Sequence, residues 1–132
     1  MRVAAFTVRT ANWKDDHLAL QSVRLPVFVA EQKVDAREEF DSVDLVCRHV
    51  LAVDSSGTPI GTGRIDAHGK IGRMAVLPRW RKHGVGRAIM QFTLDLAREQ
   101  GMKRVYLHSQ ATAIGFYERS GFKGYGERFY EA

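Results

Sequence analysis

Two glycines follow a group of basic residues in segment 81–87. Glycine lets the backbone turn tightly and approach a ligand closely. The first turn of a helix adds free N–H groups and the positive end of the helix dipole, which favour negative charge. The pattern Arg81-x-x-Gly84-x-Gly86 therefore predicts a loop that binds phosphate groups at a helix N-terminus. The alternative is that both glycines only begin the helix.

Two other phosphate-binding motifs do not fit the sequence. A P-loop needs Gly-Lys followed by Ser or Thr, but Gly69-Lys70 is followed by Ile71. A Rossmann fingerprint needs Gly or Ala three residues after Gly86, where Ile89 stands. Nucleotide hydrolysis and hydride transfer are therefore disfavoured.

The helix that would position this loop has a clear apolar pattern. Val85, Ile89, Phe92 and Leu96 recur at spacings of four, three and four residues, and Gly101 supplies a stop. We expect strands on either side of it, at 71–77 and 104–109. A strand, helix, strand unit of this length makes its two strands parallel. The phosphate-binding loop therefore lies inside a parallel crossover, between its first strand and its helix.

The rest of the chain predicts an α/β (α+β mixed) fold. Further strands are expected at 3–9, 46–53 and 60–66, with an extended piece at 122–130. Asn12 is expected to cap a helical region over 13–32 that Pro26 breaks, and a short helix is expected at 112–119. The acidic run 35–44 is expected to be an exposed loop. The sequence thus predicts a central mixed, mostly antiparallel sheet with helices on both faces.

Composition indicates one soluble domain. The chain has 132 residues, of which 45% are hydrophobic and 27% charged. The single Cys47 excludes an internal disulfide, and the absence of a long apolar run or a signal peptide favours a cytoplasmic protein without membrane contact. The formal charge is +5, and segment 67–94 contains no Asp or Glu. A nucleic-acid-binding domain could use this basic segment to bind phosphates. Such domains also stack bases on aromatic side chains, however, and Trp80 is the lone aromatic residue from 67 to 91, which disfavours this function.

Two stretches, in the same order, resemble the GNAT superfamily of acetyl-CoA-dependent N-acetyltransferases. Residues 71–76 followed by Arg81-x-x-Gly84-x-Gly86 resemble its central strand and pyrophosphate loop, and residues 113–122 resemble its following helix. The resemblance covers 46–130, and segments 27–32 and 39–41 further resemble a bacterial subgroup of small members. It implies that 1–132 is a single GNAT-like domain.

The resemblance implies acetyl transfer from acetyl-CoA to a primary amine in a ternary complex, with a small molecule or peptide as acceptor and no metal. The backbone of Met74 and Val76 would hold the pantetheine arm, the amides of 81–87 would hold the pyrophosphate, and Arg79 and Lys82 would assist. The implied cofactor-binding residues are Met74, Ala75, Val76, Arg81, Lys82, His83, Gly84, Val85, Gly86, Arg87 and Gln110. Gln110 stands where the family often has Asn, which departs from the pattern.

The resemblance makes Tyr117 the general acid that protonates the leaving thiolate. The alternative is that the Tyr117 ring simply packs its helix against the sheet. The amine must lose a proton, and Glu31 is the first candidate base, followed by His108. The other acidic candidates are Glu39, Asp41 and Asp44, each of which we expect to be a solvated loop charge.

The alternative to an enzyme is a non-catalytic, acyl-CoA-binding regulatory module, which would keep the cofactor site without the chemistry. Family members usually add a last strand after the segment that matches 122–130, whereas this sequence stops at Ala132. We therefore expect a missing final strand and a sheet edge that is open or covered by a second copy in a homodimer.

Overall fold

A mixed sheet forms the centre of the computed structural model, which describes residues 5–31, 42–108, 123–125 and 129–131. Within these residues the sheet has seven strands in the order β1-β2-β3-β4-β5-β7-β6. The strands are β1 (Phe6–Ala11), β2 (Arg48–Asp54), β3 (Pro59–Ile65), β4 (Lys70–Val76), β5 (Tyr106–His108), β6 (Lys123–Tyr125) and β7 (Phe129–Glu131). The β4–β5 pair is parallel and the other pairs are antiparallel. The predicted mixed, mostly antiparallel sheet is confirmed.

The prediction of a missing final strand is wrong. The sequence predicts one extended piece at 122–130, but the structure has two strands here, because β6 lies within this segment and β7 begins at Phe129 and ends at Glu131. These strands pair antiparallel, and β7 lies between β5 and β6. The edge beside β5 is therefore occupied by the chain itself. Three-residue strands were not distinguishable because their alternating pattern is too short.

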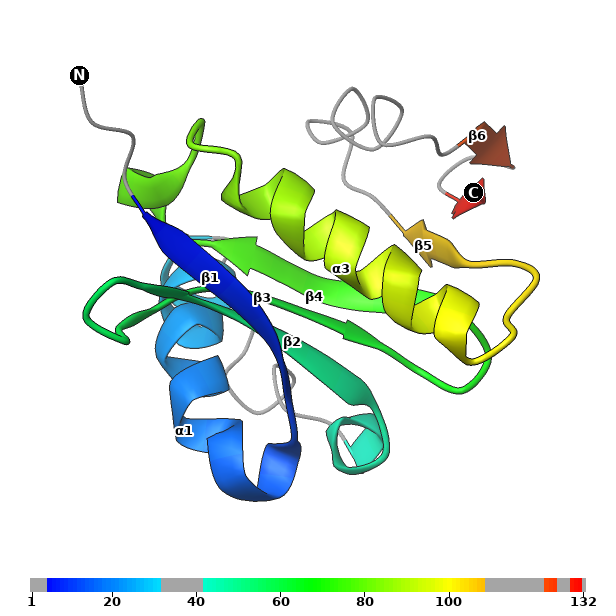
Figure 1. The fold of residues 1–132 in the computed structure, drawn as a ribbon, viewed down its shortest axis with the longest axis horizontal. Helices are drawn as coiled ribbons and strands as arrows, with labels where there is room; N and C mark the ends of the chain where they lie inside the picture. The colour runs from blue at the N-terminus through cyan, green and yellow to red at the C-terminus, as the bar shows by residue number, and fades with distance from the viewer. Residues whose placement is uncertain (1–4, 32–41, 109–122, 126–128, 132) are drawn as a thin grey trace.

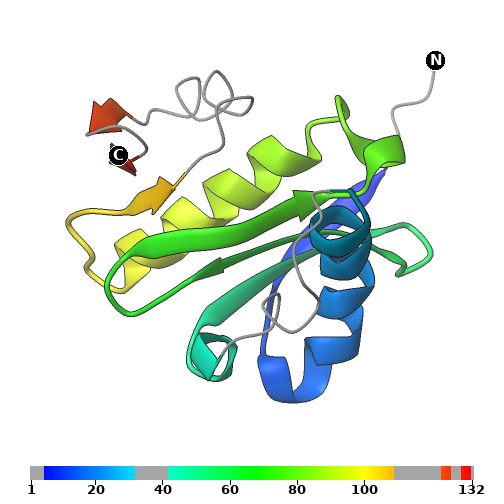
Figure 2. The ribbon, with the colours of Figure 1, turned by 180° about the vertical axis from the view of Figure 1, so that it is seen from behind.

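Helices cover both faces of the sheet (Figures 1 and 2). Helix α1 (Trp13–Arg24) continues into the π-helix η1 (Leu25–Glu31) on one face, and α3 (Val85–Glu99) covers the other. The short 3-10 helices are η2 (Ser42–Leu45) and η3 (Pro78–Trp80). Because Pro26 lacks an N–H donor, the α-helical pattern ends just before it, as the sequence predicts.

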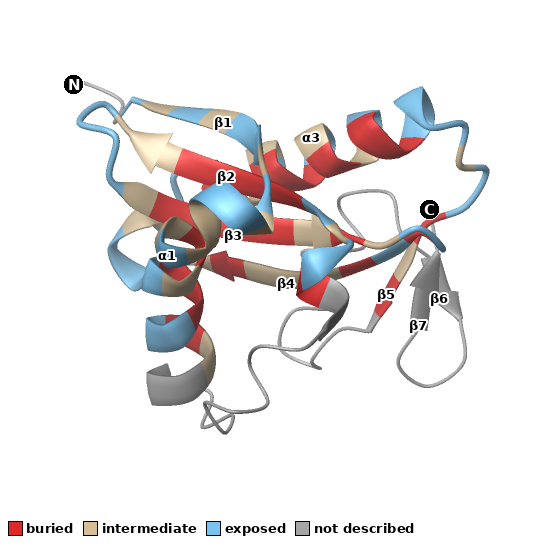
Figure 3. Cartoon of the chain, turned by 90° about the horizontal axis from the view of Figure 1, so that it is seen from below, coloured by how far each residue is buried: buried red, intermediate tan, exposed pale blue. Residues whose placement is uncertain are grey.

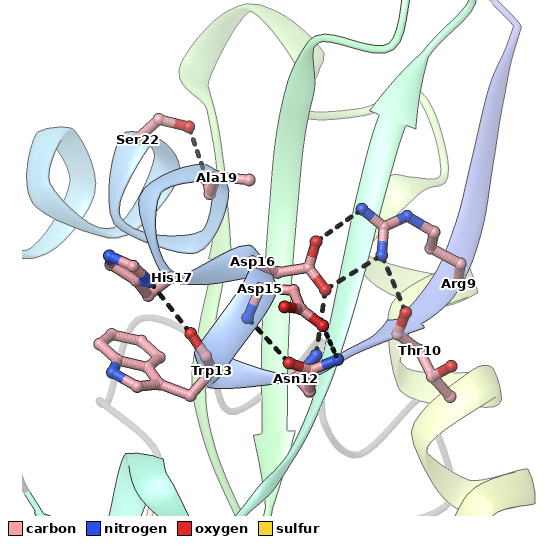
Figure 4. Close-up of polar contacts among 9 residues, drawn as sticks. All are labelled: Arg9, Thr10, Asn12, Trp13, Asp15, Asp16, His17, Ala19 and Ser22. Atoms are coloured by element: carbon pink, nitrogen blue, oxygen red, sulfur yellow. Dashed lines mark hydrogen bonds and ion pairs between the residues drawn. The ribbon is translucent and has the colours of Figure 1, made fainter.

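Asn12 caps α1 as predicted (Figure 4). Its side-chain oxygen accepts a hydrogen bond of 2.8 Å from the Asp15 N–H, and its own N–H donates to the Asp16 carboxylate at 3.1 Å. Arg9 of β1 also bonds Asp16, at 3.0 Å. The start of α1 is thereby fixed to the end of the edge strand.

Buried residues lie along the central strands and the sheet-facing sides of α1 and α3 (Figure 3). On the α3 face, Ile89 and Val85 pack with Val50 and Ile60 of the sheet. On the α1 face, Val23 and Val27 pack with Ala75 of β4. The core thus lies on both faces of the central strands.

Close packing of α3 depends on glycine at Gly61 in β3. A Cβ added there would lie 2.7 Å from Ile89 Cδ1 and 3.0 Å from Val85 Cγ1. Real Cβ atoms do not approach so closely, so the Ile89 side chain or the helix itself would have to shift. Gly61 therefore sets how near the N-terminal half of α3 lies to the sheet.

We predict that Gly61→Ala lowers the free energy of unfolding by about 1–3 kcal/mol through overpacking. Gly72→Ala is the matched control, because its Cβ would have Arg64 Nε at 3.8 Å as its nearest neighbour, an ordinary contact. Urea denaturation of both variants measures the difference. Equal stabilities would contradict this explanation of the helix packing.

Candidate functional site

The C-terminal half of β4 has an open edge among the described residues. β4 pairs with β5 only at Lys70 and Ile71, whereas it pairs with β3 up to Val76. The described pairing of the two parallel strands ends at Ile71, and the residues that follow His108 lie outside the described part of the chain. In the described part of the sheet, residues 72–76 have a neighbouring strand on the β3 side alone.

The direction of the β4 peptide groups follows from one hydrogen bond. Leu77 N–H donates to the Ile60 carbonyl at 3.0 Å. Since peptide groups alternate in direction along an antiparallel strand, Ala75 also faces β3, and Val76 and Met74 face the open edge. The side chain of Ala75 is buried with Val23 and Val27. Met74 and Val76 are thus the β4 residues able to pair with an added extended chain.

A bulge interrupts β4 at Arg73. The β3–β4 register shifts between Thr62 and Arg64, so that two residues of β4 face one of β3. Arg73 has φ of +50°, a left-handed conformation that costs a non-glycine residue about 1–3 kcal/mol. The Thr62 hydroxyl donates to the Arg73 carbonyl at 2.9 Å. This bond holds the strained residue in place.

The loop after β4 ends at a helix start with unused donors. Gly84 is the N-cap of α3, has φ of +84° and supplies no side-chain acceptor. The first helical hydrogen bond runs from Ala88 N–H to the Gly84 carbonyl, at 3.0 Å. The N–H groups of Val85, Gly86 and Arg87 therefore have no intrahelical acceptor. These three N–H groups and the positive end of the dipole of a fifteen-residue helix would therefore both favour an anion at the start of α3.

The loop is tied to β4 by a side chain. Arg81 Nε donates to the Val76 carbonyl at 3.0 Å, which leaves the Val76 N–H as its open backbone group. His83 lies edge-on to Trp80 with 5.9 Å between ring centroids, and Trp80 lies edge-on to Phe6 of β1 at 6.4 Å. These contacts fix the loop against the sheet. The sequence pattern placed Arg81 in the loop but did not predict its bond to the strand.

The charges around this helix start are positive. The first turn of α3 contains no acidic residue. The basic residues exposed there are Arg79, Arg81, Lys82 and Arg87. An anion at the amides would thus meet favourable charge, and a chain extended from it would reach the open edge of β4. The residues present fit a diphosphate joined to an amide-bearing arm, which is the chemistry of coenzyme A.

The prediction that Asp44 is a solvated loop charge is wrong. Asp44 is fully buried in η2, and Arg24 binds it bidentately, at 3.0 and 2.9 Å. Arg64 donates to the same carboxylate at 2.7 Å. His49 Nε2 lies 2.9 Å from the Asp44 carbonyl oxygen. The acidic run 35–44 gives no indication that Asp44 is buried, because the arginine partners of Asp44 lie about twenty residues away in the sequence, on α1 and β3.

The environment of this cluster lowers the pKa values of Asp44 and His49. Burial would raise the pKa of the Asp44 carboxyl, but the hydrogen bonds and charges of Arg24 and Arg64 outweigh burial and hold it below its ordinary value. Burial lowers the pKa of His49 below its ordinary value. Asp44 is therefore an ionised structural anion, occupied by two guanidinium groups, and a poor candidate for the general base.

We predict that stability falls in two pH windows. Below pH 6.5 the unfolded chain protonates His49 before the folded chain does, so the free energy of unfolding falls with pH until the lowered folded pKa is passed. The Asp44 contribution persists above 3.8 and is lost as pH falls through its lowered folded pKa. Urea denaturation from pH 8 to 3 measures both windows.

His49→Gln tests the assignment of the first window. The amide can still donate to the Asp44 carbonyl, but it does not titrate. We expect the decline that begins near 6.5 to shrink in this variant, while the acid window remains. His68→Gln, in the exposed β3–β4 turn, is the control for removing a histidine. An unchanged profile in His49→Gln would contradict the assignment.

The predicted catalytic residues are not tested by the described structure. Tyr117 and Gln110 lie outside the described residues, as do Glu39 and Asp41. Glu31 ends η1 and His108 ends β5, and their side chains are outside the description. The structure does bring together the predicted loop residues and the open edge of β4.

In the described part of the chain, no three or more histidine, cysteine and acidic side chains lie together in a group that could hold a metal ion. In that same part of the chain, none of the helices is both long enough and apolar enough to cross a membrane.

Comparison with known proteins gives a consistent result. The family model described as "Acetyltransferase (GNAT) domain" matches residues 26–132. A Bacillus subtilis protein named as a candidate acetyltransferase is 37% identical over 122 residues, covering 88% of this chain and 82% of that protein. The uncharacterized N-acetyltransferase YjcF of the same organism is 36% identical, covering 80% and 77%. The crystal structure of an acyl-CoA N-acyltransferase from Pseudomonas aeruginosa matches with a TM-score of 0.78 at 28% identity, covering 96% and 97%.

Proposed function

Because the chain belongs to the GNAT family of acetyltransferases, we propose that it transfers an acetyl group from acetyl-CoA to a primary amine by direct attack in a ternary complex. The observation that carries the proposal is the set of unused amides at Val85, Gly86 and Arg87, placed beyond the open edge of β4. Acetyl-CoA supplies an activated thioester. The residues of the chain have to bind acetyl-CoA, remove a proton from the amine and supply a proton to the leaving thiolate.

The donor-binding residues act mainly through the backbone. The α3 amides and the loop donors bind the pyrophosphate, with Lys82, Arg87 and Arg79 adding positive charge. The Met74 and Val76 peptide groups pair with the pantetheine amides as an added strand would. The loop residues in this proposal are Arg81, Lys82, His83, Gly84, Val85, Gly86 and Arg87. Val85 contributes its N–H, since its side chain is buried.

The transfer needs two proton movements. The neutral amine nitrogen forms a bond to the acetyl carbon, and the bond from that carbon to sulfur breaks. The thiolate takes a proton from the Tyr117 hydroxyl, and the nitrogen gives a proton to Glu31 or His108, directly or through water. The products are an amide and a free thiol.

Thiol release with a panel of primary amines tests the proposal. We expect free thiol to form only when acetyl-CoA and an amine are both present, with the amide product detected by mass spectrometry. Binding of acetyl-CoA without release for any amine would contradict catalysis and favour an acyl-CoA-binding regulatory module.

Tyr117→Phe separates these outcomes. Loss of a general acid lowers turnover by about 10²- to 10⁴-fold. The affinity of the Tyr117→Phe variant for CoA, measured by calorimetry, is expected to match that of the unsubstituted chain. Unchanged turnover would show that Tyr117 has a packing role.

A further inference from the structure

The peptide groups of β4 change direction once along the strand. At the start of β4, the Lys70 carbonyl faces β3, because it accepts a hydrogen bond of 3.0 Å from the Asp66 N–H. Just past the other end, Leu77 faces β3 as well, since its N–H donates to the Ile60 carbonyl at 3.0 Å. In regular alternation, residues that face the same neighbouring strand are an even number of positions apart. Positions 70 and 77 differ by an odd number, so one step within β4 is inverted.

The inversion lies at the bulge described above. Arg73 has the left-handed φ of +50°, and the register with β3 shifts beside it. With regular alternation from Lys70 onward, the peptide groups of Met74 and Val76 would face β3. The bulge turns them to the opposite edge of β4. The open edge therefore has its donors and acceptors at these two residues because of the bulge.

The Thr62 side chain of β3 holds the inverted peptide group. Its hydroxyl donates to the Arg73 carbonyl at 2.9 Å, and Thr62 is 1% exposed, so this bond is shielded from water. The Met74 N–H belongs to the same planar peptide group as that carbonyl and points in the opposite direction. Holding the carbonyl toward Thr62 therefore directs the Met74 N–H away from β3.

The inference rests on the proposed function, in which the donor arm pairs with this edge. We propose that Thr62 is a positioning residue for the donor: its hydroxyl keeps the Met74 and Val76 peptide groups at the open edge and so sets the affinity for the amide-bearing arm of CoA. Because Thr62 is buried, it acts through β4 and not by contact with the arm.

The reason is a shift of population. Without the hydroxyl, the strained backbone of Arg73 loses a group that holds it, and part of the molecules relaxes toward regular alternation. A ligand that needs the inverted form then binds more weakly, in proportion to the fraction of molecules that keep this form. The pyrophosphate, which binds at the start of α3, does not depend on this fraction.

Two ligands separate the arm from the rest of the donor. CoA carries the pyrophosphate and the pantetheine arm, whereas 3′-phospho-ADP carries the pyrophosphate without the arm. The ratio of their affinities, measured by calorimetry, is the preference that the arm supplies. Thr62→Val removes the hydroxyl and keeps a side chain of similar shape. We expect the preference for CoA to fall about fivefold in this variant, the size of one net hydrogen bond, with 3′-phospho-ADP affinity changed less than about twofold.

Two further variants exclude a merely structural effect. Thr62→Ser retains the hydroxyl and is expected to retain the preference for CoA. Thr93→Val is the matched control, because the Thr93 hydroxyl is also buried and donates to a backbone carbonyl, that of Ile89, at 2.8 Å within α3. Its loss should leave the preference unchanged. In an NMR titration of Thr62→Val with CoA, the shifts at Met74 should shrink while those at the start of α3 remain.

The outcomes distinguish this inference from the proposed function. No preference for CoA in the unsubstituted chain, an unchanged preference in Thr62→Val, or an equal loss in Thr93→Val would overturn the role of Thr62. Acetylation of an amine would in those cases still support the proposed function. If the preference depends on Thr62 but no amine releases thiol from acetyl-CoA, the proposed transfer fails and the role of Thr62 in binding the arm stands.

Discussion

Asp44→Ala is expected to lower the free energy of unfolding by about 3–5 kcal/mol, the cost of removing one partner of a buried ion pair. The substitution leaves Arg24, which has no exposed surface, without its bidentate carboxylate. Arg64 loses its 2.7 Å partner as well. Two guanidinium groups would then face each other beneath α1. Chemical denaturation at pH 7 measures the loss.

Asp95→Ala is the matched control. Asp95 also pairs with an arginine at 3.0 Å, but its side chain is 56% exposed and that of Arg98 is 70% exposed. An exposed pair of this kind contributes about 0–1 kcal/mol. If the two substitutions cost the same, the assignment of Asp44 as a buried structural anion bound by Arg24 and Arg64 is wrong.

Gly84→Asp is expected to weaken CoA binding by at least about thirtyfold. A carboxylate at the N-cap would stand beside the amides proposed to bind the pyrophosphate. Repulsion between like charges 4 Å apart is about 4 kcal/mol near a protein surface, and half of that already corresponds to about thirtyfold. Aspartate tolerates a left-handed backbone better than most residues, so the fold should persist. Calorimetry with CoA gives the affinity.

Gly57→Asp controls for backbone strain and for the added charge. Gly57 has φ of +85° against +84° at Gly84, and a Cβ at either position meets nothing within 4 Å. Gly57 lies in the β2–β3 turn, which is not part of the loop and helix start proposed to bind the pyrophosphate. We expect CoA affinity close to that of the unsubstituted chain. A similar loss in both variants would show that the effect at Gly84 is not local.

Elements with strong local signals were predicted well. The apolar stripe and Gly101 predicted α3 within about two residues, and the turn residues Asp54 to Pro59 predicted the β2–β3 hairpin. Asn12 predicted the cap of α1 because its side chain bonds within the same turn. In each case the determining contacts are close in sequence. β6 and β7 lacked such signals because each has only three residues.

The candidate site was predicted in part. The glycine pattern predicted the loop and helix start, but the bond from Arg81 to the Val76 carbonyl and the bulge at Arg73 depend on strand register, which the pattern does not encode. The sequence predicts a solvent-exposed Asp44 because its acidic neighbours suggest a loop. Its arginine partners come from α1 and β3, and no local periodicity connects them.

The most direct test of the account is an NMR titration of the 14.9 kDa chain with CoA, following backbone amide signals. The account predicts the largest shifts at Val85, Gly86 and Arg87, with a second group at Met74 and Val76. Gly57, in the β2–β3 turn, should not respond. No shift at the start of α3 with millimolar CoA, or shifts confined to other elements, would contradict the proposal that this helix start and strand edge bind the donor.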